Sequence, residues 1–282
     1  MTKTLTYALA LVALLLTAAG PALATEGHAP VKVVVLLETG IGGGTQAQGF
    51  LDRFLGVVAE RSGWSATESK YTTKRSRALK YISRQSPQLG LFSLAAFLEL
   101  QATQQLDVVG EAIATAAGGR RYYLVAKTGA GLDTCKGQTL ASNHLGDPRF
   151  VDNVVFAGAA RLAEFRTTKT RRPVQTLKAV IRDQARCALI DDAQLAALEG
   201  IEGGETLEPV WTSAELPPIP IVAFPNAPAP LRKEFVAALE QVCVGEGAET
   251  CANIGVQALR KANQKVYDDV IALYRSNEVA KP

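Results

Sequence analysis

The segment VKVVVLLETGIGGGT, residues 31–45, decides how the chain is interpreted. Residues 31–37 form a nearly continuous β-branched and apolar run, which is typical of a strand buried on both faces of a parallel sheet. The glycine-rich residues 39–45 follow at once, and apolar residues between 50 and 58 then recur at helical spacing before Gly63 ends the helix. Strand, glycine-rich turn and helix in this order predict the start of a β-α-β unit.

The same alternation continues along the chain. The expected further strands are residues 65–70, 89–93, 121–127, 138–143, 187–191 and 208–213, and the expected further helices are residues 73–85, 94–101, 149–164, 174–184, 229–243 and 251–274. Strands that alternate with helices at this spacing predict an α/β protein with doubly wound sheets. Because the pattern restarts near Arg121, two α/β lobes joined by extended strands fit this order better than one long sheet.

Composition excludes several classes of protein. The chain has 282 residues, of which 48% are hydrophobic and 20% charged, so it can bury one or two cores and is not a disordered chain. The net charge of +3 is too small and too scattered to indicate a nucleic-acid-binding protein. His28 and His144 are the two histidines of the sequence, which leaves little scope for metal sites or catalytic triads.

Residues 1–24 are typical of a signal peptide. Lys3 precedes an apolar run of Ala, Leu, Val and Thr, Gly20-Pro21 interrupts the run, and Ala22-Leu23-Ala24 forms an Ala-x-Ala cleavage site. No later segment of the sequence reaches the roughly 18 apolar residues of a membrane helix. We therefore expect a soluble protein that is exported to the periplasm and cleaved near Ala24.

Four cysteines follow the signal peptide, at positions 135, 187, 243 and 251. An even number of cysteines in an oxidising compartment predicts disulfides. The sequence has no C-x-x-C motif and no histidine near a cysteine, which disfavours zinc and redox sites. Cys243 and Cys251 flank a short connection between two expected helices, and Cys135 can meet Cys187 if the strands that follow them are neighbours.

Enzyme motifs are incomplete. The pattern Gly40-x-Gly42-x-x-Thr45 has Thr in place of the third glycine of a dinucleotide site, and no acidic residue ends the next strand. The P-loop, G-x-S-x-G and H-E-x-x-H motifs are absent from the sequence. We therefore expect neither an enzyme nor a cofactor, and the glycine-rich segment is either a tight turn or a set of backbone amides that hold an anion.

The order of several short motifs resembles the type II periplasmic binding proteins of ABC transporters, in their phosphate, phosphite and phosphonate branch. The matching motifs are Phe92-Ser93, Gly110-Glu111 before Tyr122-Tyr123, CKGQTLAS at 135–142, ALIDD at 188–192, and Ser213 with Leu216-Pro-Pro-x-Pro220. Their order covers nearly the whole chain after the signal peptide, although each motif alone is weak.

The resemblance implies two doubly wound lobes joined by a two-strand hinge. Residues 25–122 and 222–282 would form the first lobe, and residues 123–221 would form an inserted second lobe. The hinge crossings would lie at Tyr123–Lys127 and Ile219–Phe224. In function, the resemblance implies a monomer that captures a small-molecule ligand between its lobes and delivers it to an ABC transporter permease in the inner membrane.

Ligands of open α/β sheets bind outside the carboxyl ends of the strands. The expected ligand-binding residues are Gly43, Gly44, Thr45, Ser93, Tyr123, Asn143, His144 and Asp191. For two of them an ordinary structural role fits as well, because His144 can bond to the backbone of its loop and Asp191 or Asp192 can cap the helix that begins at Ala193. Tyr122 and Tyr123 point in opposite directions, so one can face the ligand while the other packs.

The sequence departs from phosphonate binders at one helix start. A segment rich in Ser and Thr typically cradles the tetrahedral anion in that branch, whereas this chain has Gly146-Asp147-Pro148-Arg149. Without these hydroxyls, and with Asp147 nearby, a phosphonate would be repelled unless Arg149 compensates. We therefore expect a larger and less charged ligand than a simple phosphonate.

Two further functions remain open at the level of sequence. One is a periplasmic ligand-sensing partner of a membrane receptor, and the other is an exported enzyme. The basic residues Lys74, Arg75, Arg77, Lys80, Arg84, Lys169, Arg171 and Arg172 are expected to form a solvated helix face and an exposed loop, with docking to an acidic or anionic surface as the alternative.

Overall fold

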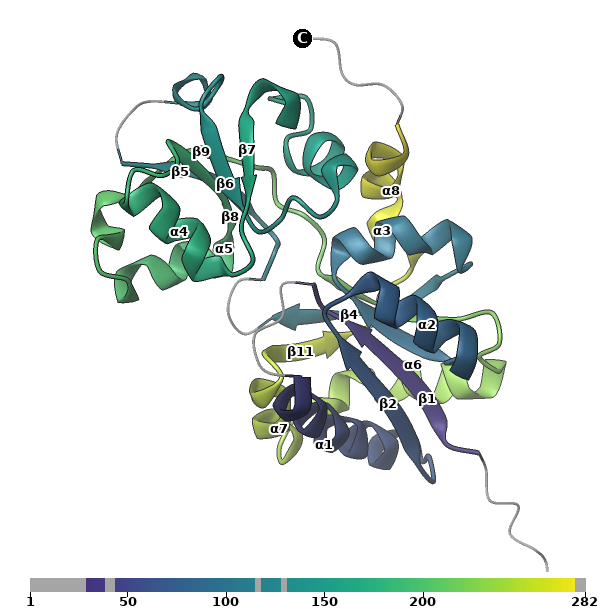
Figure 1. Cartoon of the computed structure of the whole chain (residues 1–282). Helices are drawn as coiled ribbons and strands as arrows, with labels where there is room; N and C mark the ends of the chain where they lie inside the picture. The colour runs from purple at the N-terminus through teal and green to yellow at the C-terminus, as the bar shows by residue number, and fades with distance from the viewer. Residues whose placement is uncertain (1–28, 39–43, 115–117, 128–130, 277–282) are drawn as a thin grey trace, which may run out of the picture.

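The computed structural model describes residues 29–38, 44–114, 118–127 and 131–276. These residues form two lobes, each built on its own β-sheet with helices packed on it (Figure 1). Residues 1–28 lie outside the described part, so the predicted signal peptide has no structural description here. The mixed α/β architecture with two sheets agrees with the predicted fold class.

The first lobe contains a six-stranded sheet in the order β11-β4-β10-β3-β1-β2. Its strands are β1 (Val31–Leu36), β2 (Thr67–Thr72), β3 (Leu89–Phe92), β4 (Asp107–Ala114), β10 (Ile219–Ala223) and β11 (Val256–Arg260). β1 pairs in parallel with both β2 and β3, as the continuous apolar runs of β1 and β3 predict, while β10 lies antiparallel between β3 and β4.

Helices cover both faces of this sheet. They are α1 (Gly44–Ser62), α2 (Arg75–Gln85), α3 (Leu94–Thr103), α6 (Ala229–Val242), α7 (Gly247–Asn253), the 3₁₀ turn η6 (Gln264–Tyr267) and α8 (Asp268–Arg275). Alternate residues of β1 point to opposite faces. Val33 and Val35 belong to the core cluster shared with α1, α6 and α7, and Val34 and Leu36 to the one shared with α2, α3 and α8.

The second lobe contains a five-stranded sheet in the order β7-β6-β8-β5-β9. Its strands are β5 (Tyr122–Ala126), β6 (Thr139–Ser142), β7 (Arg166–Lys169), β8 (Cys187–Asp191) and β9 (Glu208–Thr212). Its helical segments are α4 (Pro173–Ile181), α5 (Asp192–Ala196), the π-helical η2 (Phe150–Val155), and the 3₁₀ turns η1 (Leu132–Thr134), η3 (Leu162–Glu164), η4 (Ala197–Gly200) and η5 (Gly204–Thr206).

The predicted hinge crossings at Tyr123–Lys127 and Ile219–Phe224 differ from the crossings in the structure. β5 belongs wholly to the second sheet and β10 wholly to the first, so the chain crosses between the lobes just before each of them. The described crossing residues lie side by side, because the Leu216 amide donates to the Arg120 carbonyl at 2.7 Å and the Ser213 amide to the Tyr122 carbonyl at 2.9 Å. Backbone pairing therefore joins the two crossings.

Two predicted helices, residues 149–164 and 251–274, are longer than the helical segments in the structure. Within residues 251–274, α7 ends near Gly255, whose φ of 75° is left-handed, and β11 then pairs antiparallel with β4. Within residues 149–164, η2 ends before Ala157 and Gly158, which also have positive φ, and β7 follows. For β11, a short segment after a glycine fits a strand as well as a helix, and its pairing with β4 decides between them.

Both predicted disulfides are present. Cys135 is bonded to Cys187 with a sequence separation of 52 residues, and Cys243 is bonded to Cys251 with a separation of 8. The first bond ties the segment before β6 to the start of β8 in the interior of the second lobe. The second ties the end of α6 to α7, which places α7 against α1.

The loop lengths predict how much each disulfide stabilises the fold. Constraining the unfolded chain contributes about 4 kcal/mol for the longer loop and about 2.5 kcal/mol for the shorter one. The double variant Cys135→Ser/Cys187→Ser should therefore lose more free energy of unfolding than Cys243→Ser/Cys251→Ser, as measured by denaturant titration. Equal losses, or a reversed order, would contradict this ranking.

Candidate functional site

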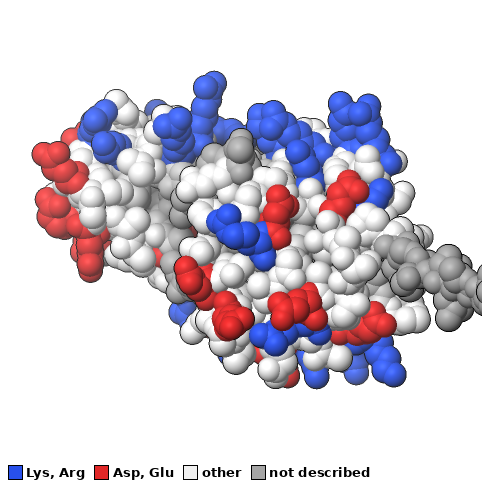
Figure 2. All heavy atoms as spheres, turned by 90° about the horizontal axis from the view of Figure 1, so that it is seen from below, with Lys and Arg blue, Asp and Glu red and all other residues white. Residues whose placement is uncertain are grey.

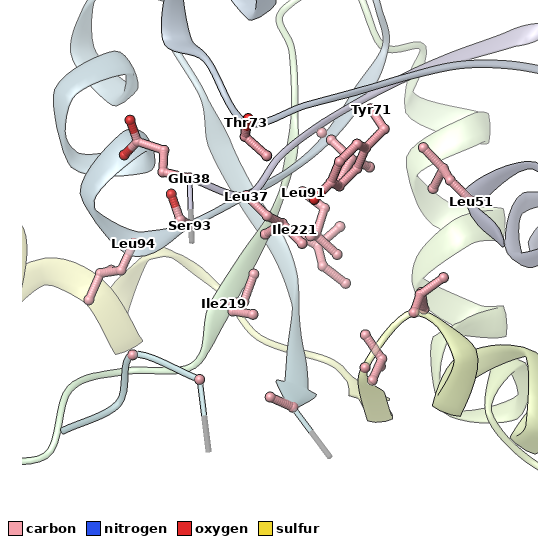
Figure 3. A pocket seen from close by; sticks show the side chains of 18 of the residues that line it. Leu37, Glu38, Leu51, Tyr71, Thr73, Leu91, Ser93, Leu94, Ile219 and Ile221 are labelled. Atoms are coloured by element: carbon pink, nitrogen blue, oxygen red, sulfur yellow. The ribbon is translucent and has the colours of Figure 1, made fainter. Parts of the chain in front are cut away.

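A cavity of about 670 Å³ opens between the lobes and continues into the first lobe. Both lobes line it, the first with residues of β1, β3, α1 and α2, and the second with residues that follow β6 and β8. Figure 3 shows the first-lobe side, where Glu38 and Ser93 lie at one end and Leu37, Leu91 and Ile221 lie toward the centre. The volume falls within the range of small-molecule binding sites.

Ser93 lies where β3 ends and α3 begins. Its backbone amide donates to the Leu36 carbonyl at 2.8 Å, which fixes its position beside the end of β1. Its Oγ is buried and has no hydrogen-bond partner among the described residues, and it does not cap α3. A hydroxyl of this kind at a helix N-terminus can hydrogen-bond a ligand in the cavity.

Asn143 and His144 follow β6 in the second lobe, and both line the cavity. His144 Nε2 lies 2.7 Å from Gln194 Oε1 and 3.7 Å from Asp191 Oδ2, and the His144 side chain is only 4% exposed. Its ring packs edge-on against the Tyr122 ring, with centroids 5.1 Å apart. His144 is therefore held by side chains and borders the cavity.

Asp191 performs the capping role and also reaches the cavity. Its Oδ1 accepts from the Gln194 amide at 2.9 Å as the N-cap of α5. Burial raises the pKa of its carboxyl, against the opposing effect of the neighbouring His144. Asp192 accepts from the Gly119 amide at 2.8 Å, which ties α5 to the crossing segment.

The structure corrects the choice between the two tyrosines. Tyr122 lines the cavity, whereas Tyr123 packs against the core cluster of the second lobe beneath α4. The alternation of side chains along β5 accounts for the difference, because the two residues are adjacent.

The predicted glycine-rich binding segment is described only in part. Gly43 lies outside the described residues, whereas Gly44 and Thr45 belong to the first turn of α1. Ala47, in the same helix, lines the cavity.

Sequence reasoning missed an ion cluster at the cavity mouth, made of Arg75, Glu38 and Asp147. Arg75 starts α2 and donates to Glu38 Oε2 at 2.7 Å and to Asp147 Oδ2 at 2.9 Å, and it also pairs with Glu99. Because Asp147 belongs to the second lobe, this pairing joins the lobes directly. Burial lowers the pKa of Arg75, but the Glu38 hydrogen bond and the surrounding carboxylates raise it overall.

Arg75 therefore differs from the basic residues around it. Lys74, Arg77, Lys80 and Arg84 are exposed, as expected for a solvated helix face. Figure 2 shows Lys and Arg side chains along one edge of the face seen from below, with charges of both signs on the rest of it. The arginine at the start of α2 has no sequence feature that separates it from these neighbours.

The C-terminal helix α8 completes the link between the lobes. Tyr274 donates its hydroxyl to Asp147 Oδ2 at 3.1 Å, and burial, with a further contribution from Asp147, raises the pKa of Tyr274 to about 12. Asn153 in η2 donates to the Tyr274 and Ser276 carbonyls. The Arg149 guanidinium lies over the Tyr274 ring, 5.6 Å from its centroid, and adds a cation–π contact to this link.

Other kinds of site find little support in the described part of the chain. Among those residues, no group of three or more His, Cys, Asp or Glu side chains is placed to hold a metal ion. None of the described helices is long and apolar enough to cross a membrane.

The lobes, the paired crossings and the shared cavity define the fold of type II periplasmic binding proteins, and solved structures agree. The chain is similar to the binding protein component of an ABC phosphonate transporter from Pseudomonas aeruginosa, with a TM-score of 0.65 and 14% identity over 86% of this chain and 85% of that one. It is also similar to PhnD1 of Prochlorococcus marinus in complex with methylphosphonate, with a TM-score of 0.65 and 11% identity over 87% of this chain and 97% of that one.

A third similar structure is the periplasmic aliphatic sulphonate binding protein SsuA of Escherichia coli, with a TM-score of 0.55 and 12% identity over 89% of this chain and 94% of that one. The first and third of these structures are named as binding proteins, and the second is a complex with methylphosphonate. No protein-family model matches the chain, and no curated protein matches it in sequence.

Asp191 predicts a pH dependence of stability. Because its pKa is raised in the folded state, the native protein binds this proton more readily than the unfolded chain does. The resulting stabilisation is fully present below the unfolded pKa of about 3.9 and is lost as pH rises through the folded pKa. As pH rises from about 3.9, the unfolding free energy of the native sequence should therefore fall relative to that of Asp191→Asn.

The measurement is denaturant unfolding of both proteins across the acidic range. Asp133→Asn, which removes one negative charge from an exposed side chain, is the matched control. A constant difference between the native sequence and Asp191→Asn would contradict the prediction.

Proposed function

We propose that the chain is an exported solute-binding protein that captures a small ligand between its two lobes and delivers it to an ABC permease in the inner membrane. The observation that carries this proposal is a cavity that both lobes line at the carboxyl ends of strands. A ligand there contacts Ser93 on one lobe and Asn143 and His144 on the other. Contacts to both lobes favour the closed form over the open one.

Two further observations support export and closure. Disulfides at both predicted pairs are typical of oxidising compartments. The Arg75–Asp147 ion pair holds the lobes together at the cavity mouth, and both side chains are largely shielded from water. Because this pair spans the lobes, it stabilises the closed arrangement beside the ligand.

The proposal predicts ligand capture that changes the shape of the molecule. Protein purified from the periplasm should carry a small molecule at one copy per chain in native mass spectrometry. After the molecule is extracted and returned, the melting temperature should rise and the radius of gyration in small-angle scattering should fall. Arg75→Gln should reduce this compaction, and Arg77→Gln on the exposed face of α2 should preserve it.

A protein without any bound small molecule, or an unchanged radius at saturating ligand, would count against the binding function. Equal compaction in Arg75→Gln and Arg77→Gln would show that the Arg75–Asp147 ion pair does not contribute to closure.

The geometry also predicts which ligands bind weakly. The resemblance to phosphonate binders implies hydroxyls at residues 146–149, which this chain lacks; Asp147 accepts from the Tyr274 hydroxyl instead, and Arg149 lies over the Tyr274 ring. Each missing charge-assisted hydrogen bond removes about 1.5 to 3 kcal/mol, so the loss of two weakens binding by roughly two to four orders of magnitude. Methylphosphonate, phosphite and phosphate should therefore bind weakly in calorimetry, and sub-micromolar affinity for any of them would overturn the prediction.

A further inference from the structure

The cavity continues beneath α1 into the interior of the first lobe, and this inner part is here called the chamber. Its walls are apolar side chains of the sheet and of the facing helix, namely Val33, Val35, Leu91, Leu51, Phe54 and Val58. Residues of α6 and α7 close its far side. Figure 3 shows Leu91 and Ile221 on the sheet facing Leu51 on α1.

Polar and packing contacts hold α1 at its two sides. The Gln48 side chain accepts from the Tyr71 amide of β2 at 2.8 Å and donates to Ser69 Oγ at 2.6 Å. Asp52 accepts from the Ser69 hydroxyl at 2.7 Å. On its other side, α1 packs against α6 and α7. These contacts hold α1 over the sheet, and the cavity extends between the helix and the sheet.

The side chains that form the chamber walls are buried. Leu91, Val35 and Phe235 keep only 8%, 5% and 5% of their surface accessible. Protein interiors normally contain few voids larger than a water molecule, so a cavity that continues from the interlobe opening into the interior of a lobe fits a binding feature better than a packing fault.

Charge is confined to the cavity mouth. Apart from tyrosines, the charged or titratable residues among the described lining are Glu38, Arg75, His144, Asp147, Lys169 and Asp191. Each of them ends or follows a strand or starts α2, and none belongs to α1, α6 or α7. Three are carboxylates, and the Arg75 guanidinium is already paired with Glu38 and Asp147. The mouth therefore suits a polar head of low charge, and the chamber suits a hydrocarbon tail.

We propose that the ligand is an amphiphile whose hydrocarbon tail occupies the chamber beneath α1 and whose uncharged polar head lies at the mouth near Ser93. This inference rests on the proposed binding function and specifies its ligand class. The unpartnered Ser93 Oγ supplies a hydrogen bond to the head. The apolar walls bind the tail by removing its surface from water.

The experiment is calorimetry with primary alcohols from hexanol to dodecanol and with the carboxylates of the same chain lengths. Burial of each added methylene should tighten binding roughly fourfold until the chamber is full. Each alcohol should bind more tightly than its carboxylate, because carboxylates line the mouth. Affinity that does not change with chain length would overturn the tail assignment, and tighter binding of the carboxylates would overturn the uncharged head.

A variant that narrows the chamber locates the tail. Leu91→Phe places a larger side chain in the space and should weaken the longest alcohols at least tenfold while the shortest change little. Leu79→Phe makes the same substitution on α2 at a site that is 38% exposed, and its binding should match that of the native sequence. Unchanged binding of the longest alcohols by Leu91→Phe would overturn the assignment. Val35→Leu, at the cross-strand neighbour of Leu91, gives the same measurement if Leu91→Phe does not fold.

The outcomes separate this inference from the proposed function. If the alcohols fail to bind but the molecule that co-purifies still compacts the protein, the amphiphile is wrong and the binding function stands. If neither the alcohols nor any co-purifying molecule binds, both are wrong.

Discussion

The hydrogen-bonded pair of crossing segments is the constraint on which the rest of the structure depends. The Leu216 amide bonds to the Arg120 carbonyl, and the Ser213 hydroxyl accepts from the Tyr122 amide. Because the second lobe is an insertion, the chain must leave the first sheet and return to it at one place. Pairing the two crossings there brings the carboxyl ends of the central strands of both lobes to the same gap, where the cavity lies.

Much of this arrangement can be predicted from local sequence. The continuous apolar run of β1 and the helical spacing in α1 are strong signals, and the compartment indicated by residues 1–24 makes the disulfides the expected state of the cysteines. The rest depends on contacts between distant segments. β11 follows Gly255 as a short apolar run whose partner, β4, lies far away in sequence. Nothing in its own residues separates a strand from a helix.

The candidate site shows the same division. Ser93, Asn143, His144 and Asp191 reach the cavity because they end strands, a rule that needs only the order of the elements. Arg75 could not be separated from its basic neighbours, because its role depends on Asp147 from the other lobe and its charge looks like theirs in sequence. Tyr274 joins the same cluster from the last helix, which no local pattern predicts.

Gln48 has a second effect that arises from its position beside β2. This strand is at the edge of the first sheet, and an exposed edge offers its amides to strands of other molecules. By accepting from the Tyr71 amide, the Gln48 side chain occupies one of these donors. The residue that keeps α1 beside the edge strand therefore also protects that edge against intermolecular strand pairing, and so against aggregation at high concentration.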